Sequence, residues 1–574
     1  MYVGQSIKRR EDDRFLTGRG NYVDDINAPN AAYAAFVRSP LAHAQIRKLD
    51  TARAKNMPGV LAVITGEDWA AAGLGKAPCI SPVNFSDGRK MNTATRPILV
   101  AAKVCHVGDP IAAVIAERRW QALDAAEAVE VDYAALPAVT DAGAALTDGA
   151  PVLHEALGTN LIFDVEHGDK PATATAFVAA HHIAELDLIN NRISANPIEP
   201  RCCLGKHDRA TDHYTLYTSN QAPHLLRNWL AEDTLFIPEH KLRVVAPDVG
   251  GGFGMKLTVY PEEATVLWAA QVVGRPVRWV ATRSVSLISD TQGHETTYCQ
   301  IVADRLRCDI DDVELVFGDT DRLVAGVGTW GSRSLVMAGM ALTTAADKIF
   351  AKCQQLAAHL LECAEADLDV ENGQFTVKGT DHRLSFREVS RAAYHGSNLP
   401  EQFEIGLDET VFYEPEAWVF SSSIHLAVVL VDAETGRVTR RDYYAVDDSG
   451  RVINPMIVEG QLHGAILQGA GQAMIESCVY DQTTGQLLSG SFMDYGMPRA
   501  SDRPSFRTDF QETPAPSDPL GAKGAGESGT LGAPPAIVNA VSDALAHMGL
   551  NHIDMPLTPD RIWRALKDRP DLRP

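Results

Sequence analysis

The chain has 574 residues, of which 45% are hydrophobic and 22% charged, as expected for a globular protein of about two to four domains. Its formal net charge of −22 has the same sign as a phosphate backbone, so a nucleic-acid partner is not expected. The nine cysteines form no CxxC pair, which disfavours a zinc ribbon or an iron–sulfur cluster in this chain and indicates a reducing compartment. We expect a cytoplasmic protein without a membrane span, because the start of the chain resembles no secretory signal and its longest charge-free run, 460–475, is short and rich in glycine.

The first part of the chain has the pattern of a mixed α/β domain. Residues 59–69 are a short apolar run closed by glycine, which predicts a strand. Residues 110–133 predict a strand, a helix and a strand, and the helix carries apolar residues at helical spacing: Trp120, Leu123, Ala126 and Val129. The stretch 135–154 is rich in Ala, Pro and Gly, so we place a domain boundary there and expect the strands on its two sides to belong to different sheets.

Residues 241–282 form the clearest local unit. Alternating apolar residues predict a strand that leads into the glycine loop 250–254, and Pro261 and Gly274 mark the ends of the next helix. Four glycines in this loop present backbone N–H groups and permit close approach, as in an anion-binding loop, although a tight turn is the simpler interpretation. Their spacing does not match GxGxxG, because Met255 occupies the third glycine position, so a dinucleotide-binding fold is disfavoured.

Two later stretches combine glycines with helical patterns. The helix expected at 458–477 contains four glycines, each of which costs about 1 kcal/mol relative to alanine. We expect tight helix packing at Gly460 and Gly464, whereas the second pair is open to packing or to a ligand contact at Gln468 and Gly469.

The stretch 521–541 has one carboxylate, Glu527, in a glycine loop before a helix that we expect to begin at Pro534. A helix N-terminus favours negative charge, but such a carboxylate is more often simply solvated than catalytic. Hairpins are predicted at Asn372-Gly373 and at 433–437.

Taken in chain order, these sequence motifs resemble those of the large, molybdopterin-binding subunit of the xanthine oxidase family, which includes carbon-monoxide dehydrogenases and aldehyde oxidoreductases. The motifs that carry the resemblance span nearly the whole chain: 9–26, 107–117, 194–201, 218–224, 250–254 (GGGFG), 292–298 (QGHETTY), 328–334 (GTWGSRS), 447–500 and 523–541 (KGAGESGTLGAPPAIVNAV). The resemblance implies an α+β fold with an N-terminal α/β hammerhead-type domain, residues 1–145. It also implies a large molybdopterin-binding domain of two subdomains, 146–290 and 291–574, the first of them truncated.

The resemblance also implies a molybdenum hydroxylase catalytic subunit, which adds water-derived oxygen to an aldehyde or an N-heteroaromatic compound. Glu527 matches the general base beside the molybdenum. The resemblance implies a molybdopterin cofactor in its cytosine dinucleotide form, with molybdenum held through the pterin rather than by protein side chains. The residues that match cofactor-holding loops are Gln221, Gly252, Phe253, Gly254, Gln292, Gly293, His294, Gly331, Ser332, Arg333, Ser334, Gln468 and Gly469.

Partner subunits follow from the same resemblance. Because electrons leave such subunits through iron–sulfur clusters to a flavin, we expect an iron–sulfur small subunit and an FAD-binding medium subunit, arranged as a dimer of heterotrimers around a small-molecule substrate.

One departure from the family pattern falls at 289–295. Two motifs that a long middle segment separates in relatives adjoin each other directly here. The chain therefore either carries an internal deletion or is a naturally short variant. That segment includes the loop that carries a cysteine beside the metal in carbon-monoxide dehydrogenases. The alternatives are therefore a carbon-monoxide dehydrogenase large subunit or an inactive remnant that keeps assembly surfaces. We also expect proteases to cut readily at this joint, residues 289–295. The apolar surfaces that the missing segment would have covered should be exposed to solvent.

Overall fold

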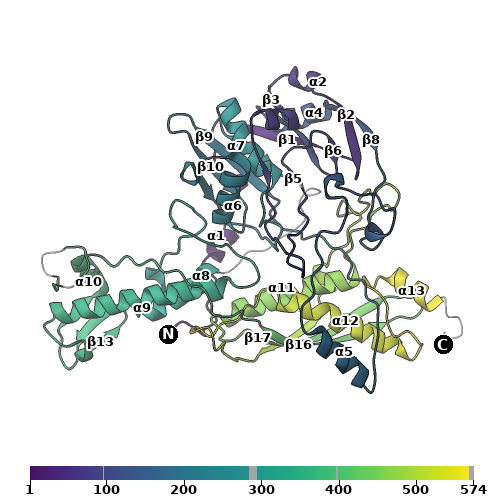
Figure 1. The fold of residues 1–574 in the computed structure, drawn as a ribbon. Coiled ribbons are helices and arrows are strands. Elements are labelled where there is room, and N and C mark those ends of the chain that lie inside the picture. Colours follow the sequence, from purple (N-terminus) through teal and green to yellow (C-terminus); the bar gives the residue numbers. More distant parts are fainter. Residues whose placement is uncertain (95, 283–293, 396–398, 402, 568–574) are drawn as a thin grey trace.

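The structure, a computed structural model, describes residues 1–94, 96–282, 294–395, 399–401 and 403–567. Figure 1 shows an upper body, which contains a large sheet, and an elongated lower body. The large sheet has seven strands in the order β11 (Leu242–Val245), β10 (His213–Thr218), β9 (Cys202–Asp208), β12 (Val277–Val280), β1 (Ala32–Arg38), β7 (Pro110–Ala116) and β3 (Val60–Thr65). Most of the predicted joint at 289–295 lies outside the described residues.

This sheet joins strands from both sides of the stretch 135–154. Strand β1 pairs in parallel with β12, with Ala32 opposite Val277. The prediction that this stretch separates strands of different sheets is therefore wrong, because the buried edge of β1 takes its partner from a segment about 240 residues further along. The domain limits at 145 and 290 remain predictions.

Helices on the upper body close its core. Helix α7 (Pro261–Val273) packs on the large sheet, and it begins at Pro261 and ends at a left-handed Gly274, as predicted. The predicted strand, helix and strand at 110–133 are β7, α4 (Arg119–Glu127) and β8 (Glu130–Ala135). Of the apolar residues at helical spacing, Val129 is buried and Ala126 packs against the core, whereas Trp120 and Leu123 are exposed. The smaller Ala122 and Ala125 are buried against the closely packed strands instead.

The remaining elements of the upper body are short. Strands β6 (Lys103–Val104), β2 (Ala44–Asp50) and β8 form a second sheet, and β4 (Lys76–Ala77) pairs with β5 (Arg96–Pro97). The short helices are α1 (Asp12–Leu16), α2 (Ala52–Lys55), α3 (Gly66–Ala71) and α6 (Pro223–Trp229).

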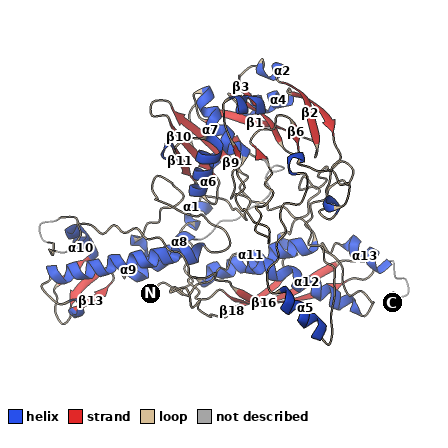
Figure 2. Ribbon diagram, in the orientation of Figure 1, coloured by secondary structure: helices blue, strands red, loops and turns tan. Residues whose placement is uncertain are grey.

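The lower body consists of two helix-and-sheet units, as Figure 2 shows by colour. In one unit, α8 (His294–Leu306), α9 (Ser334–Leu360) and α10 (Phe386–Ala393) accompany the sheet β13 (Leu368–Glu371), β14 (Gln374–Val377) and β15 (Arg383–Ser385). In the other, α11 (Pro455–Met474) and α12 (Ser528–Ala546) pack on one face of β16 (Ser422–Val431), β17 (Val438–Asp448) and β18 (Ser505–Phe510). The outlying helices are α5 (Lys170–Ala179) and α13 (Pro559–Lys567). Both predicted hairpins are confirmed, as β13–β14 and β16–β17.

Helix α12 begins earlier than predicted. It starts at Ser528 and contains Pro534 and Pro535, so the expectation of a start at Pro534 is wrong. Proline has a φ suited to a helix, and close packing of α12 on α11 offsets the hydrogen bonds that the two prolines cannot donate.

Helix α9 is the one described helix whose length and composition would allow it to cross a membrane, which alone is weak evidence. Its apolar residues have partners within the protein. Val336 and Met340 are buried near its start, while Cys353 and Leu356 belong to the core formed with β13 and β14.

Glu476, just after α11, is a buried acid whose titration makes stability depend on pH. It is 4% exposed, its carboxylate accepts a hydrogen bond from Tyr495 at 2.8 Å, and burial raises its pKa to about 7. The pKa of an unburied Glu is 4.5, so between pH 4.5 and pH 7 the folded chain holds a proton on Glu476 that the unfolded chain has lost. This group therefore lowers the free energy of unfolding as pH rises from 4.5 to 7. Glu476→Gln is therefore expected to leave stability unchanged near pH 4 and to raise it by up to about 3 kcal/mol above pH 7. Denaturant unfolding at both pH values checks this, and an equal effect at both would contradict it.

Candidate functional site

Gln221 links the glycine loop 250–254 to the loop 328–334. Its amide donates to the carbonyl of Thr329 at 2.8 Å, and its Oε1 accepts from the backbone N–H of Lys256 at 3.1 Å. A Cβ added at Gly252 would lie 2.2 Å from Cδ of Gln221, so only glycine permits this approach. The structure therefore brings together three of the segments that the sequence singled out.

The glycine loop presents its outer half to open space. Gly251, Phe253 and Gly254 have positive φ values of 95°, 46° and 78°, and the Phe253 side chain is 46% exposed. A Cβ at Gly254 would meet no atom within 4 Å. Gly254 therefore leaves room for another group beside the loop.

A buried ion pair between Glu199 and Lys256, which the sequence analysis missed, fixes the glycine loop. The Glu199 carboxylate accepts from the N–H of Gly250 and from Lys256 Nζ, both at 2.8 Å. The Lys256 side chain is fully buried, and burial lowers its pKa. Glu199 lies in the motif at 194–201 that the sequence singled out, but its pairing with Lys256 could not be predicted from the sequence.

The loop 328–334 ends at the N-terminus of α9 and carries polar atoms that have no hydrogen-bond partner among the described residues. Gly331 and Ser332 have positive φ, which turns the chain sharply before the helix. The Arg333 guanidinium lies 3.6 Å from the ring centre of Trp330, and no carboxylate among the described residues forms an ion pair with it. Arg333 Nε and Ser334 Oγ are buried and lack hydrogen-bond partners within the described chain. A helix start with such groups suits an anionic ligand.

Glu527 lies against the same loop. It occupies the N-cap position of α12, and its Oε2 accepts a hydrogen bond from Ser332 Oγ at 2.6 Å. Gly524 permits this contact, because a Cβ there would lie 2.4 Å from the Ser332 carbonyl oxygen. The predicted position of Glu527 before a helix N-terminus is confirmed, and its side chain is exposed toward solvent.

His294 joins the site through Tyr298. The two rings stack at 5.3 Å, and the Tyr298 hydroxyl donates to the Ser334 carbonyl at 2.9 Å. Burial lowers the pKa of His294 to about 4, so its imidazole is neutral at pH 7. Gln292 and Gly293, the other residues predicted in this segment, lie outside the described residues.

Arg14 is a second residue that sequence reasoning missed. Its guanidinium pairs with Asp248, before the glycine loop, at 2.7 Å and with Glu295, at the start of α8, at 2.6 Å. It therefore fixes two of the converging segments relative to each other.

The second pair of glycines in α11, which the sequence left open, serves packing, whereas the first pair does not. Gly469 contacts α12, where an added Cβ would lie 2.8 Å from the Thr530 carbonyl oxygen, and Gly471 lies against the Glu476 carboxylate. Gly460 and Gly464, expected to serve helix packing, are exposed with nothing within 4 Å of an added Cβ. That expectation is wrong, because α12 crosses the other face of α11. Gln468 Oε1 accepts a hydrogen bond from Thr530 Oγ1 at 3.3 Å, so it lies at the α11–α12 contact.

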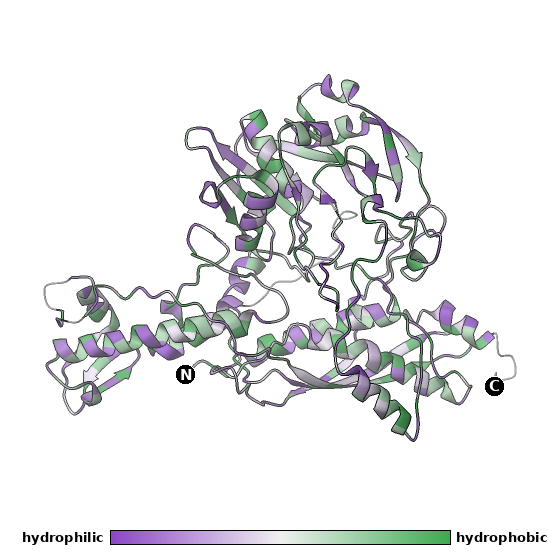
Figure 3. Ribbon diagram, in the orientation of Figure 1, coloured by the Kyte–Doolittle hydropathy of each residue, from purple (hydrophilic) through white to green (hydrophobic). Residues whose placement is uncertain are grey.

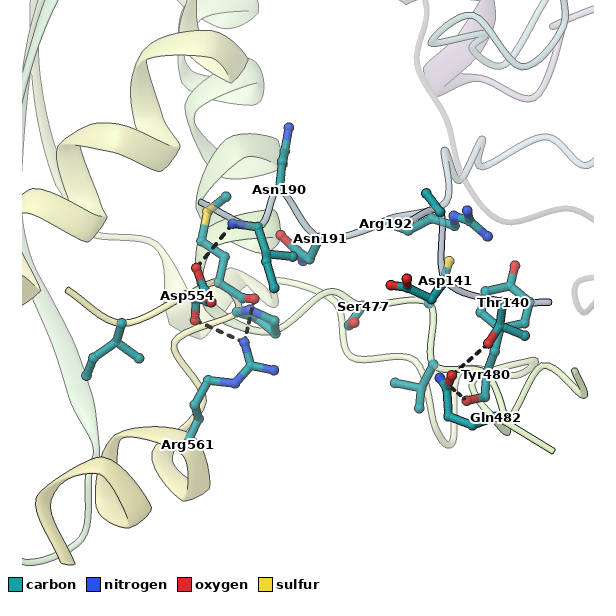
Figure 4. A pocket seen from close by; sticks show the side chains of 17 residues that line it. Thr140, Asp141, Asn190, Asn191, Arg192, Ser477, Tyr480, Gln482, Asp554 and Arg561 are labelled. Carbon is teal, nitrogen blue, oxygen red and sulfur yellow. Dashed lines mark hydrogen bonds between the residues drawn. The ribbon is translucent and has the colours of Figure 1, made fainter. Parts of the chain in front are cut away.

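The contacts thus connect Gln221, the glycine loop, the loop 328–334 and Glu527, whereas Gln468 and Gly469 belong to the adjoining helix contact. A cavity of about 720 Å³ lies elsewhere, between the segments 140–142, 189–192, 477–482 and 553–561 (Figure 4). No cluster of three or more His, Cys, Asp or Glu side chains suited to a metal ion occurs within the described ranges.

Gly252→Ala is expected to destabilise the chain by about 1–3 kcal/mol, because the new methyl group displaces the Gln221 amide and breaks its two partly buried hydrogen bonds. Gly460→Ala is the matched control: its site is open and helical, so stability should rise by up to about 1 kcal/mol. Denaturant unfolding of both variants checks this, and equal effects of the same sign would contradict the geometry.

Comparison with known proteins gives three matching family models. Two are described as molybdopterin cofactor-binding domains and match residues 153–304 and 282–504. The third, described as the aldehyde oxidase and xanthine dehydrogenase a/b hammerhead domain, matches residues 17–137.

Individual relatives match over the whole chain. The carbon monoxide dehydrogenase large chain of Hydrogenophaga pseudoflava is 29% identical over 97% of this chain and 96% of the relative. The nicotine 6-hydroxylase large subunit of Paenarthrobacter nicotinovorans is 27% identical over 100% of this chain and 95% of the relative. The crystal structure of quinoline 2-oxidoreductase from Pseudomonas putida 86 superposes with a TM-score of 0.91 at 28% identity, covering 99% of each chain.

The first of these alignments is longer than the chain itself. It spans 789 positions, against 574 residues here, so at least 215 positions of the relative have no counterpart in this chain. The two cofactor-binding models meet at 282–304, a range that includes the joint predicted from the sequence.

Proposed function

Because this chain belongs to the molybdopterin-binding large subunits of the xanthine oxidase family, which are molybdopterin-dependent oxidoreductases, we propose that it hydroxylates an aldehyde or an N-heteroaromatic compound. The observation that carries this proposal is the direct contact of Glu527 with the loop 328–334, which Gln221 joins to the glycine loop. A carboxylate beside a ligand loop supplies a general base where the substrate reacts.

The residues present fit a phosphate-bearing pterin cofactor. Arg333 offers a guanidinium without a carboxylate partner, and Ser334 Oγ at the start of α9 has no hydrogen-bond partner within the described chain. Gly252, Phe253 and Gly254 would present backbone amides to it, and Gly331 and Ser332 would line it opposite. We propose the cytosine dinucleotide form, with Gln292, Gly293 and His294 completing the contacts. Gln468 and Gly469 would contribute by holding the start of α12, which carries Glu527, through their contacts with Thr530.

When bound, the molybdenum cofactor supplies the two-electron oxidation of a substrate carbon. Glu527 accepts a proton at Oε1 while Ser332 Oγ donates to Oε2 and fixes the carboxylate plane. The Gln221 amide has both of its polar atoms engaged, so its side chain is held in one orientation at the floor of the site. The His294 imidazole, neutral at pH 7, offers an anionic ligand no positive charge, so any contact from it would be an uncharged hydrogen bond.

The family match places the chain among large subunits of multisubunit enzymes, as the names of its relatives indicate. We propose that an iron–sulfur small subunit and an FAD-binding medium subunit receive the electrons, in a cytoplasmic dimer of heterotrimers. None of the nine cysteines forms a CxxC pair, so the clusters are assigned to a partner.

A second candidate substrate is carbon monoxide, favoured by the identity with carbon monoxide dehydrogenase large chains. The missing segment argues against it, since the cysteine-bearing loop that the family resemblance assigns to such enzymes is absent from the sequence. An inactive remnant is the third possibility.

Turnover in ¹⁸O-labelled water tests the proposal and separates these candidates. The purified complex is incubated with an aldehyde, a quinoline-type ring or carbon monoxide and an artificial electron acceptor. Label from water in a hydroxylated ring or carboxylic acid supports the proposal. Turnover of carbon monoxide alone would favour the second candidate, and absence of any turnover in protein that holds molybdenum would favour the remnant.

A further inference from the structure

A stripe of large apolar side chains is exposed along the outer face of the sheet β16–β17–β18. We call it the outer stripe; it consists of Ile424, Leu426, Val428 and Leu430 of β16, with exposed fractions of 77%, 55%, 37% and 61%, together with Phe420, 75% exposed, just before the strand. The residues in between, such as His425, Ala427 and Val429, face α11 and α12, which cover only the other side of the sheet (Figure 2). The outer stripe therefore lacks the cover that the inner face has.

The sequence of β16 is typical of a strand that is buried on both faces. Ser422–Val431 reads SSIHLAVVLV, with no Asp, Glu, Lys or Arg and no proline. A nearly continuous apolar run of this kind is typical of interior strands, whereas edge strands usually carry charges or prolines. Yet β16 stands at the edge of its sheet and pairs only with β17 among the described strands. Both its outer face and its free edge are suited to another polypeptide.

A second bare segment leads from α5 toward β9. In α5, Phe177 and Val178 are 56% and 90% exposed, and Figure 3 shows hydrophobic residues on this helix at the periphery of the lower body. Beyond it, Ile183, Leu186 and Leu188 are 53%, 61% and 68% exposed, although no strand is formed at 181–190. Leu186 and Leu188 alternate with Glu185 and Asp187, which is the pattern of a strand without a neighbour.

The comparison with relatives indicates what would cover these surfaces. At least 215 positions of the Hydrogenophaga pseudoflava relative have no counterpart here, yet the chain superposes over 99% of its length on a solved relative with a TM-score of 0.91. The remaining parts have thus kept their arrangement instead of closing over the gap. A chain that keeps this arrangement without the additional positions leaves exposed whatever surfaces those positions would cover.

We propose that the outer stripe, the free edge of β16 and the segment 181–190 bind a separate polypeptide equivalent to the internal stretch that the relatives carry. Such a partner would present apolar, strand-forming segments, one of which extends the sheet at β16 while others cover the outer stripe. The proposal concerns assembly, so it stands apart from the proposed reaction. A second copy of this chain is the competing occupant.

Binding of the relative's stretch as a separate polypeptide tests this. The probe is the internal stretch of the Hydrogenophaga pseudoflava large chain that has no counterpart here, mixed with the full chain. We expect a one-to-one complex by native mass spectrometry, and amide exchange across Ser422–Val431 slowed about tenfold or more. Binding of a hydrophobic dye to the chain should fall on complex formation.

Paired lysine variants make the test specific. Ile424→Lys with Leu426→Lys alters only exposed side chains, so the chain still folds, but affinity for the probe should fall about tenfold or more because two charges would be buried. Leu16→Lys, at a residue 85% exposed on α1, is the matched control and should bind as the parent does. Absence of a complex, or equal binding by the paired variant, would overturn the proposal. So would a chain that dimerises by itself with exchange at β16 already slow, which would assign the surface to a second copy.

Discussion

Replacing Glu527 by glutamine is expected to lower turnover per molybdenum at least a hundredfold. The amide keeps the shape of the carboxylate and its hydrogen bond from Ser332, but it cannot accept a proton at pH 7. General-base contributions of about 10²–10⁴-fold set the size of the effect. Cofactor content should stay near that of the parent, because other loops supply the proposed cofactor contacts. Initial rates with an aldehyde or quinoline-type substrate, divided by molybdenum content, give the measurement.

An exposed glutamate outside the site provides the control for this variant. Glu434→Gln lies in the β16–β17 turn and should leave the rate per molybdenum unchanged. A Glu527→Gln enzyme within a few-fold of the parent would remove Glu527 from the reaction. A rate loss that only follows lost molybdenum would make Glu527 a cofactor ligand rather than a base.

Glu199→Ala is expected to produce the largest loss of stability, about 3–5 kcal/mol. The variant leaves the Lys256 ammonium fully buried without its carboxylate partner at 2.8 Å, and the Gly250 N–H also loses its acceptor. Unfolding by denaturant, followed by circular dichroism, should show a much lower midpoint. Since the pair holds the glycine loop in place, molybdenum content should fall as well.

The double variant Glu199→Leu with Lys256→Met separates charge burial from packing. Removing both charges leaves no unpaired ion, so most of the lost stability should return. A double variant as unstable as Glu199→Ala would show that contacts of the glutamate side chain, rather than the buried charge, stabilise the loop.

Local elements followed from the sequence where local chemistry determines them. Pro261 and Gly274 limited α7, and the Asn372-Gly373 turn placed a hairpin, because caps and turns depend on residues close in sequence. Glu527 was expected in a loop before a helix, but the start of that helix at Ser528 did not follow from Pro534 and Pro535.

Features set by distant contacts could not be predicted from one sequence. The pairing of β1 with β12 and the bridge of Arg14 between Asp248 and Glu295 join segments more than 230 residues apart. Gly460 and Gly464 of α11 were wrongly assigned to helix packing, because four glycines in one helix do not reveal which side the next helix crosses. Lys256 shows the same limit: only the fold reveals that its partner is Glu199.

Metal and pterin content of the purified chain tests the central claim most directly. The chain, expressed in a host that makes the molybdenum cofactor, is analysed by inductively coupled plasma mass spectrometry and by fluorescence of oxidised pterin released on denaturation. Binding in the site formed by Gln221, the glycine loop, the loop 328–334 and Glu527 predicts about one molybdenum and one pterin per chain, at the one-cofactor stoichiometry of a single site. Protein that is folded but contains neither molybdenum nor pterin would contradict the account.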